Sequence, residues 1–290
     1  MIEFNRCAIV IKQTALAQGG RAAELARSGD ATAKRILHAD AEQQRTIETV
    51  RLSLGKRKIV FAETSLVNAD ARVKGQLAIS DLVITIGGDG TALGASHYIR
   101  GGVMLGVNSA PGDSVGHFCS VNRENFAERL DAILSGKWKP KELARLQVML
   151  DEKTLPELAL NDVLIAHECP ASTTRYLLKI ARREEEHRSS GIWISTAAGS
   201  TAGIGSAGGR KMPLGSKRIQ YLVRELYREP KRSYALTRGF IEADENILVA
   251  SKMTAGEMYI DGAKTRYDFP FGTRAKVTVA EHSLKIFLNN

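Results

Sequence analysis

The feature of this sequence most able to carry chemistry is a glycine-rich segment that holds a single acid. Residues 81–86 are largely apolar and β-branched, and they run directly into Gly87-Gly88-Asp89-Gly90-Thr91. This order predicts a strand, a glycine turn and a helix start, which is where α/β sheets bind ligands. Glycines let backbone N–H groups approach phosphate oxygens, and the following helix presents its positive end to the same anion. We therefore predict a phosphate-binding loop. It is not a Walker A loop, because no Gly-Lys-Ser/Thr follows.

The presence of Asp89 in such a loop requires an explanation, because a carboxylate repels phosphate. Two chemical roles are available. Asp89 can accept the proton of a hydroxyl that attacks a phosphoryl group, or it can help to hold Mg²⁺ between phosphates. A structural alternative is that Asp89 only caps the helix that begins near Thr91, since Asp is common at that position. The segment alone leaves these alternatives open.

The elements that must position this loop are predicted from apolar runs that alternate with polar, helix-forming stretches. Strands are expected at 7–11, 58–62, 81–86 and 103–107. Helices are expected over about 15–50, with an interruption at Gly29-Asp30, and over 123–134. Strands that alternate with helices predict a parallel sheet with crossover helices. We therefore expect an α/β N-terminal domain with a parallel sheet over residues 1–140.

Beyond residue 140 the pattern changes to short strand-like runs with few helices between them. These runs occupy 146–150, 159–166, 176–181, 191–196, 247–250, 258–260 and 275–279. A helix is expected only over 218–228. The pattern predicts a β-rich, β-sandwich-like domain over residues 141–270, with its functional residues in loops. A C-terminal strand segment over 271–290 could return to the first domain.

Composition and charge narrow the classes of protein that fit. With 43% hydrophobic and 25% charged residues, the 290-residue chain is typical of a globular protein. No apolar run approaches the roughly 20 residues of a membrane helix or has the form of a signal peptide, so a cytoplasmic protein is expected. Its three widely spaced cysteines argue against a disulfide framework or a zinc site. The net charge of +9 fits nucleic acid, an acidic membrane or anionic substrates, and does not choose among them.

Two further segments carry a family resemblance. They are Leu160-Asn161-Asp162-Val163 and the glycine- and threonine-rich run at 191–202, which ends in Gly-Ser-Thr-Ala. The GGDGT loop is similar to one shared by NAD kinases, diacylglycerol and sphingosine kinases, and phosphofructokinases. With the two further segments in the same order and spacing, residues 6–288 resemble the NAD kinase family.

Other details resemble the mitochondrial-type branch of that family. They lie at 106–111, 114–119 and 189–191. The common bacterial form would have an Asp where Ser190 stands and a Tyr where Gly203 stands.

The resemblance implies a reaction and a role for each matching residue. NADP would be formed from NAD, with ATP or inorganic polyphosphate as donor and Asp89 as the base on the 2′-hydroxyl of the adenosine ribose. The phosphate cradle would be Gly87, Gly88, Gly90 and Thr91. Residues implied to bind NAD are Asn161, Asp162, Ser190, Gly199, Ser200, Thr201 and Ala202. Arg188 is a further candidate, because it adjoins the segment at 189–191. An amide can read an adenine edge and a carboxylate can accept hydrogen bonds from ribose hydroxyls, although Asn-Asp alone is equally typical of a turn.

Cofactors and partners follow from the same resemblance. Mg²⁺ is expected with ATP. No tightly bound organic cofactor, no metal site made of protein ligands, no nucleic acid and no membrane partner are expected. A homo-oligomer, a dimer or a tetramer, is expected because family members are commonly of that kind.

Two alternative functions stay open from the sequence. A lipid kinase with the same loop would need an apolar pocket and a means of meeting a membrane, and no amphipathic, aromatic-rich anchor is evident. A non-catalytic protein that binds nucleotides or nucleic acid would use the basic surface, but such a protein has no need of Asp89 in an intact loop.

Overall fold

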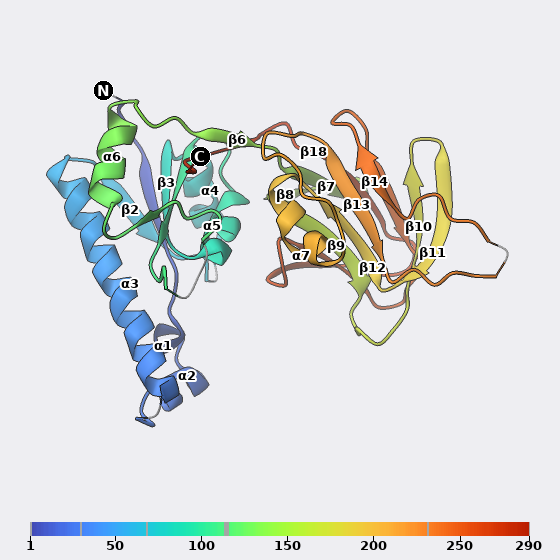
Figure 1. The fold of residues 1–290 in the computed structure, drawn as a ribbon, viewed down its shortest axis with the longest axis horizontal. Coiled ribbons are helices and arrows are strands. Elements are labelled where there is room, and N and C mark those ends of the chain that lie inside the picture. Colours follow the sequence, from blue (N-terminus) through green and yellow to red (C-terminus); the bar gives the residue numbers. More distant parts are fainter. Residues whose placement is uncertain (1, 30, 68, 113–115, 231, 290) are drawn as a thin grey trace. The chain divides into compact units, whose positions relative to one another are not determined.

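A computed structural model describes residues 2–29, 31–67, 69–112, 116–230 and 232–289. The chain divides into two compact units (Figure 1). The first contains residues 1–141 and 284–290, and the second contains residues 142–283. Part of the 114–119 segment, residues 114 and 115, lies outside the described residues. Within the described part of the chain, no helix has both the length and the apolar character needed to span a membrane.

The first unit is built on one sheet with strand order β2-β1-β3-β4-β19-β6, and β5 pairs with β4. The pairings among β1 to β5 and the pairing of β19 with β4 are all parallel. Both β3 and β4 are buried along their whole length, as expected for parallel strands covered on both faces. The strands are β1 (Cys7–Ile11), β2 (Phe61–Thr64), β3 (Leu82–Gly87), β4 (Val103–Asn108), β5 (Val121–Asn122), β6 (Lys141–Leu143) and β19 (Leu284–Ile286).

Helices cover both faces of this sheet, with α3 and α6 on one side and α4 and α5 on the other (Figure 1). Apolar residues of α3 and α6, such as Val50 and Leu130, share one core cluster with the strands. Arg57, just after α3, forms an ion pair of 2.6 Å with Asp131 of α6. The helices are α1 (Ala15–Gln18), α2 (Gly20–Leu25), α3 (Ala31–Lys56), α4 (Ala71–Ile79), α5 (Asp89–Ser96) and α6 (Phe126–Leu134).

The second unit is a sandwich of two six-stranded antiparallel sheets. Residues of both sheets, such as Leu178 and Ile194, belong to a single buried core. One sheet has the order β11-β10-β15-β18-β7-β8, formed by Arg183–Ser189, Thr174–Ile180, Ile247–Ser251, Arg274–Val279, Leu146–Leu150 and Lys153–Ala159. The other has the order β14-β13-β12-β9-β16-β17, formed by Arg238–Ile241, Ile219–Arg224, Gly191–Ser195, Asp162–His167, Gly256–Ile260 and Thr265–Asp268. Two short helices follow β12, namely η1 (Ala198–Thr201) and α7 (Gly203–Ser206). The predicted fold class, an α/β domain followed by a β-sandwich, is confirmed.

The predicted helix over 218–228 is wrong, because residues 219–224 form strand β13. Ile219, Tyr221 and Val223 enter the sandwich core, so the apolar residues follow a period of two. β13 pairs with β12 on one side and β14 on the other. Hydrogen bonding between strands and burial of this face outweigh the helical preference of the Leu, Arg and Glu residues in the stretch.

The last part of the chain is shared between the two units. β18 pairs with β7 and β15, so the second unit extends past the predicted boundary at 270 as far as Ser283. β19 then lies between β4 and β6 in the sheet of the first unit.

Candidate functional site

The phosphate-binding loop predicted from the sequence connects β3 directly to α5. β3 ends at Gly87, Gly88 is the N-cap residue of α5, and Asp89 is its first residue. The predicted order of strand, glycine turn and helix is confirmed. A Cβ on Gly87 would lie 2.6 Å from the Thr91 Oγ1 atom and 2.8 Å from the Lys12 Cβ atom. Glycine is therefore required at position 87 by packing alone.

Gly90 differs from Gly87, because no described residue requires a glycine there. A Cβ at position 90 would have no atom of the described residues within 4 Å, and the residue is exposed on a helix. A glycine in a helix costs about 0.5–1 kcal/mol relative to alanine. The fold therefore gives no reason for this glycine, whereas a ligand that must approach the backbone closely would.

The Asp89 carboxylate does not cap the helix. No side chain caps α5, and the two carboxylate oxygens accept hydrogen bonds from the backbone N–H groups of His117 and Phe118, at 2.9 and 2.8 Å. The capping alternative is wrong for this reason. Asp89 instead fastens the segment after β4 to the glycine loop. Each oxygen uses one of its two acceptor positions in these bonds, so Asp89 can still accept a proton or a further hydrogen bond.

In the second unit, Asn161 lies at the start of β9 and packs tightly against the segment after β12. Its carbonyl oxygen accepts hydrogen bonds from the Thr196 N–H at 2.9 Å and the Ser195 hydroxyl at 3.0 Å. A Cβ on Gly199 would lie 2.0 Å from that same carbonyl oxygen. Two of the segments predicted to bind NAD are thus in direct contact, and Gly199 is required for this close approach.

Asp261 holds the Asn161-Asp162 pair in place. Its carboxylate accepts hydrogen bonds from the backbone N–H groups of Leu160, Asn161 and Asp162, at 2.7, 2.7 and 2.9 Å. The sequence analysis missed this residue. An Asp-Gly pair after a strand usually indicates a turn, and nothing in the sequence connects position 261 to a segment about a hundred residues earlier.

Asp162 and Asn161 both have polar side-chain atoms that make no hydrogen bond with the part of the chain that the structure describes. The Asp162 side chain is buried, and among the described residues its carboxylate makes no hydrogen bond. The Asn161 Oδ1 atom is also buried without a partner among the described residues. Burial, and secondarily the charge of Asp261, raises the pKa of Asp162 to about 7. Buried polar groups normally find partners, so two neighbouring ones without any suggest a bound ligand.

A pocket of about 410 Å³ lies beside Asp162. Ser190 lines it, while Arg188 does not and instead forms an ion pair of 3.8 Å with Glu229. The full lining consists of Asp162, Leu164, Ala166, His167, Glu168, Cys169, Pro170, Ser172, Thr174, Ser190, Trp193, Arg224, Tyr259, Gly262 and Ala263. The volume is in the usual range for a site that binds a small molecule.

Gly203 makes room for the Trp193 ring at one wall of this pocket. A Cβ at position 203 would lie 2.8 Å from two atoms of that ring. The Arg224 guanidinium lies 5.8 Å from the ring centroid, so a cation also borders the ring. Trp193 was not among the residues predicted to bind a ligand, because a Trp in a strand is more often part of a core.

The remaining predicted NAD-binding residues differ in their surroundings. The Ser200 hydroxyl is buried, donates to the Ala197 carbonyl at 2.7 Å and accepts from the Met212 N–H at 3.0 Å. Thr201 is exposed and Ala202 is partly exposed, and neither lines the pocket. The Ser200 hydroxyl therefore stabilises the turn.

The raised pKa of Asp162 predicts a specific pH dependence of stability. An ordinary aspartate has a pKa near 3.8, and that of folded Asp162 is about 7. The folded state therefore binds a proton on Asp162 more tightly than the unfolded state does. This binding contributes most to the free energy of unfolding below pH 4, and the contribution is lost as the pH rises to 7. Asp162→Asn removes that loss. We expect the free energy of unfolding of the variant, relative to that of wild type, to be roughly 2–4 kcal/mol higher at pH 8 than at pH 4, measured by urea denaturation.

Asp268→Asn, an exposed aspartate in the same unit, is the control for removal of a surface carboxylate. A stability difference between Asp162→Asn and wild type that stays constant between pH 4 and pH 8 would contradict the prediction.

Comparisons with known proteins identify sequence relatives of this chain. Residues 73–138 match the family described as the ATP-NAD kinase N-terminal domain. A probable NADH kinase of Oryza sativa subsp. japonica is 37% identical over 230 residues, which are 72% of this chain and 71% of the relative. An NADH kinase of Arabidopsis thaliana is 37% identical over 233 residues, 72% of this chain and 73% of the relative.

Solved structures agree on the fold. An NAD kinase from Archaeoglobus fulgidus in complex with ATP has a TM-score of 0.69 at 19% identity, covering 98% of this chain and 94% of that one. Yeast NADH kinase complexed with NADH has a TM-score of 0.75 at 14% identity, covering 99% and 84%. The chain shares this level of identity with the plant enzymes over most of its own length and theirs, and it has the loop and the Asn161-Asp162 segment as well. This chain therefore belongs to the NAD kinase family.

Proposed function

We propose that this protein transfers the terminal phosphoryl group of ATP to the 2′-hydroxyl of the adenosine ribose of NAD, which gives NADP and ADP. In this step a bond forms between the ribose oxygen and the γ-phosphorus, and the bond from that phosphorus to the oxygen bridging to the β-phosphate breaks. The observation that carries the proposal is Gly90, a glycine in the first turn of α5 that no contact with a described residue requires. Relatives named as NAD and NADH kinases support it, and they set aside the lipid kinase and nucleic-acid alternatives.

The role proposed for Asp89 is that of general base. A ribose hydroxyl is a poor nucleophile until its proton has an acceptor. Asp89 is held by the amides of His117 and Phe118, which fix the orientation of its carboxylate and leave one acceptor position on each oxygen. A carboxylate oriented in this way can take the proton without reorganisation of the side chain.

The role proposed for the Asn161-Asp162 pair is recognition of the adenosine part of NAD. The support is that neither the Asn161 Oδ1 atom nor the Asp162 carboxylate has a hydrogen-bond partner among the described residues, while Asp261 fixes the backbone of both residues. Ribose hydroxyls would donate to the Asp162 carboxylate and favour its charged form, which would lower its pKa from about 7 on binding. Ser190 would border the same ligand in the adjacent pocket, while the roles predicted for Arg188, Thr201 and Ala202 have no comparable support.

Mg²⁺ is proposed to arrive with ATP. Among the described residues, no three His, Cys, Asp or Glu side chains gather into a group that could hold a metal ion. Mg²⁺ commonly binds through one or two carboxylates together with substrate phosphates and water, and a single carboxylate in the phosphate loop fits that pattern. When bound, the ion neutralises charge on the phosphates. The finer expectations of polyphosphate as a donor, a homo-oligomer and a cytoplasmic location stay predictions.

A product assay tests the proposed function. Purified protein with ATP, Mg²⁺ and either NAD or NADH should form NADP or NADPH, separated by chromatography. NADH is included because both plant relatives are named as NADH kinases. Absence of a phosphorylated dinucleotide with ATP and with polyphosphate would refute the proposal.

Replacement of Asp89 by Asn should abolish turnover. General-base assistance is typically worth about 10²–10⁴ in rate, so kcat should fall by that factor while NAD binding persists. Asn keeps one acceptor oxygen for the two amides, so a loss of about 1–2 kcal/mol in the free energy of unfolding should accompany the change. A near-normal kcat in this variant would contradict the role of Asp89 as general base. Equal losses of kcat, NAD binding and ATP binding would show that Asp89 only fastens the loop.

Replacement of Gly90 by Ala should separate stability from activity. The Cβ meets no protein atom, so the free energy of unfolding should stay the same or rise by up to about 1 kcal/mol. Activity with ATP should fall about 10- to 100-fold, the equivalent of one lost charge-assisted hydrogen bond to phosphate.

Gly75→Ala is the matched control for Gly90→Ala, because Gly75 is also a helical glycine with open space around it. It should show the same change in stability and unchanged activity. Full activity of Gly90→Ala would show that phosphate does not approach the backbone at this position.

A further inference from the structure

A polar side chain occupies a core position on the buried face of α3. Ile47, Val50 and Leu54 lie four, seven and eleven positions after Gln43, so all four residues share the face of α3 that packs on the sheet. Gln43 is only 2% exposed. Burial of an amide costs free energy unless the amide forms hydrogen bonds, so a Gln at this core position requires an explanation.

The explanation is that Gln43 bonds the ends of two strands. Its Nε2 atom donates to the Lys12 carbonyl at 3.3 Å and to the Ile86 carbonyl at 3.2 Å. These carbonyls lie at the last pair in the register of β1 and β3, where Ile11 is opposite Ile86. The Lys12 N–H also donates to the Ile86 carbonyl, at 2.9 Å. The Gln43 amide therefore joins α3 to the carboxyl end of β3, one residue before Gly87.

The glycine loop needs such support because glycines do not hold their own conformation. The glycines before Asp89 have no side chains, so many backbone conformations are open to them. On the far side of the loop, two backbone amides hold the Asp89 carboxylate. On the near side, the Gln43 side chain and the Lys12 N–H hold the Ile86 carbonyl. Contacts on both sides of the loop thus place Asp89.

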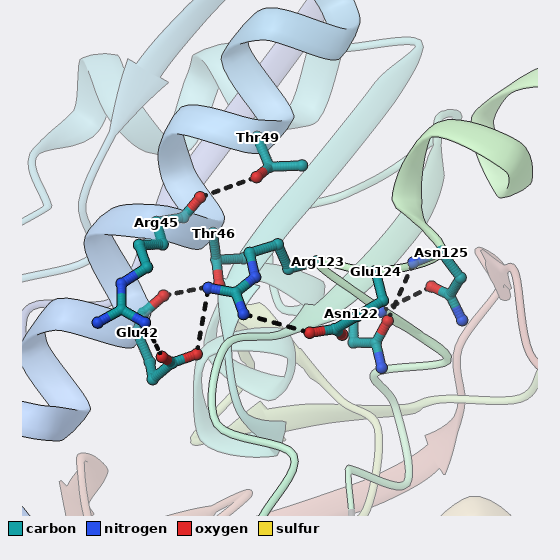
Figure 2. Close-up of polar contacts among 8 residues, drawn as sticks. All are labelled: Glu42, Arg45, Thr46, Thr49, Asn122, Arg123, Glu124 and Asn125. Carbon is teal, nitrogen blue, oxygen red and sulfur yellow. Dashed lines mark hydrogen bonds and ion pairs between the residues drawn. The ribbon is translucent and has the colours of Figure 1, made fainter.

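A second polar network on the same turn of α3 is more exposed. Glu42, the residue before Gln43, forms ion pairs with Arg45 at 2.6 Å and with Arg123 at 3.4 Å, and Figure 2 shows both pairs. Water reaches all three side chains, and ion pairs of this kind contribute little to stability. Loss of the Gln43 donor would instead leave buried carbonyls without it, which is the larger penalty.

We propose that Gln43 is a positioning residue for phosphoryl transfer, which places the Asp89 carboxylate through the Ile86 carbonyl and the glycine loop. The inference rests on the proposed function for the role of Asp89 as general base. Displacement of a catalytic group by about 1 Å can cost a factor of about 10² in rate. The backbone bonds donated by the N–H groups of Lys12 and Ser109 remain in any variant of Gln43, so a substitution there removes the side-chain support alone.

Gln43→Met tests this role. Met keeps the length of Gln but donates no hydrogen bond, so both carbonyls lose this donor. We expect kcat to fall about 10- to 100-fold and the KM for NAD to change less than about twofold, because the residues proposed to bind NAD lie in the second unit. Hydrogen exchange, followed by NMR without substrates, should be about tenfold faster at the His117 and Phe118 amides, which bond Asp89.

Gln147→Met is the matched control, because the Gln147 Nε2 atom also donates to two backbone carbonyls, those of Val148 and Leu155, at 3.2 and 2.8 Å. Both Met variants should lower Tm by a similar amount, roughly 2–8 °C. Gln147→Met should leave kcat and the exchange of both amides unchanged. Glu42→Gln, which breaks the ion pairs on the same turn of α3, should change kcat less than about twofold.

Three results would overturn the proposal. They are a kcat of Gln43→Met near that of wild type, an equal loss of kcat in either control variant, and a loss that appears only in the KM for NAD. Should Gln43→Met fail to fold, Gln43→Asn takes its place, because a shorter side chain keeps an amide but cannot reach both carbonyls. Its kcat should fall about 3- to 10-fold, and a kcat equal to that of wild type would overturn the proposal as well.

The exchange measurement separates this proposal from the proposed function. Faster exchange at His117 and Phe118 in Gln43→Met, in a protein that forms no NADP from any donor, would reject the activity and leave the placement of Asp89 by Gln43. NADP formation by wild type, with unchanged kcat and unchanged exchange in Gln43→Met, would reject the positioning role and leave the activity.

Discussion

A carboxylate removed from water must be compensated by hydrogen-bond donors, and the candidate site depends on how this chain meets that constraint. Asp261 and Asp89 are partly buried; three consecutive backbone N–H groups compensate Asp261, and two compensate Asp89. In both cases the donors are main-chain groups, so the acid fixes the course of the backbone. Asp162 is the exception, because it is fully buried without such donors among the described residues, and burial raises its pKa. Asp162 has the fewest hydrogen-bond donors of the three acids, and a bound ligand could supply them.

The glycines of the site fall into two groups with different physical causes. Gly87 and Gly199 stand where a Cβ would collide with protein atoms, so the fold alone explains them. Gly203 belongs with them, because the Trp193 ring occupies the adjacent space. Gly90 has open space around it and lowers the stability of its helix. The glycine-rich loop thus combines Gly87, which packing requires, with Gly90, for which packing against the described residues gives no reason.

The sequence was sufficient for the parts of the fold governed by local patterns. Buried parallel strands such as β3 and β4 are continuous apolar runs, and the glycine turn after β3 follows from residue types alone. The helix expected over 218–228 failed because its period-two burial is enforced by strands far away in sequence. Asp261 was missed for a related reason. It acts through contacts with a distant segment, and residue type gives no sign of them.

The position of β19 affects how this protein can be made. In the first sheet, β19 lies between β4 and β6, yet the chain reaches it only after the whole sandwich of residues 142–283. During synthesis the earlier strands leave the ribosome long before β19 does, so the part of β4 that pairs with β19, at Val103 and Met104, waits without that neighbour. Exposed edges invite pairing with other chains. The sandwich, whose strands are contiguous in the sequence, can assemble first, while the unit that contains the glycine loop closes last.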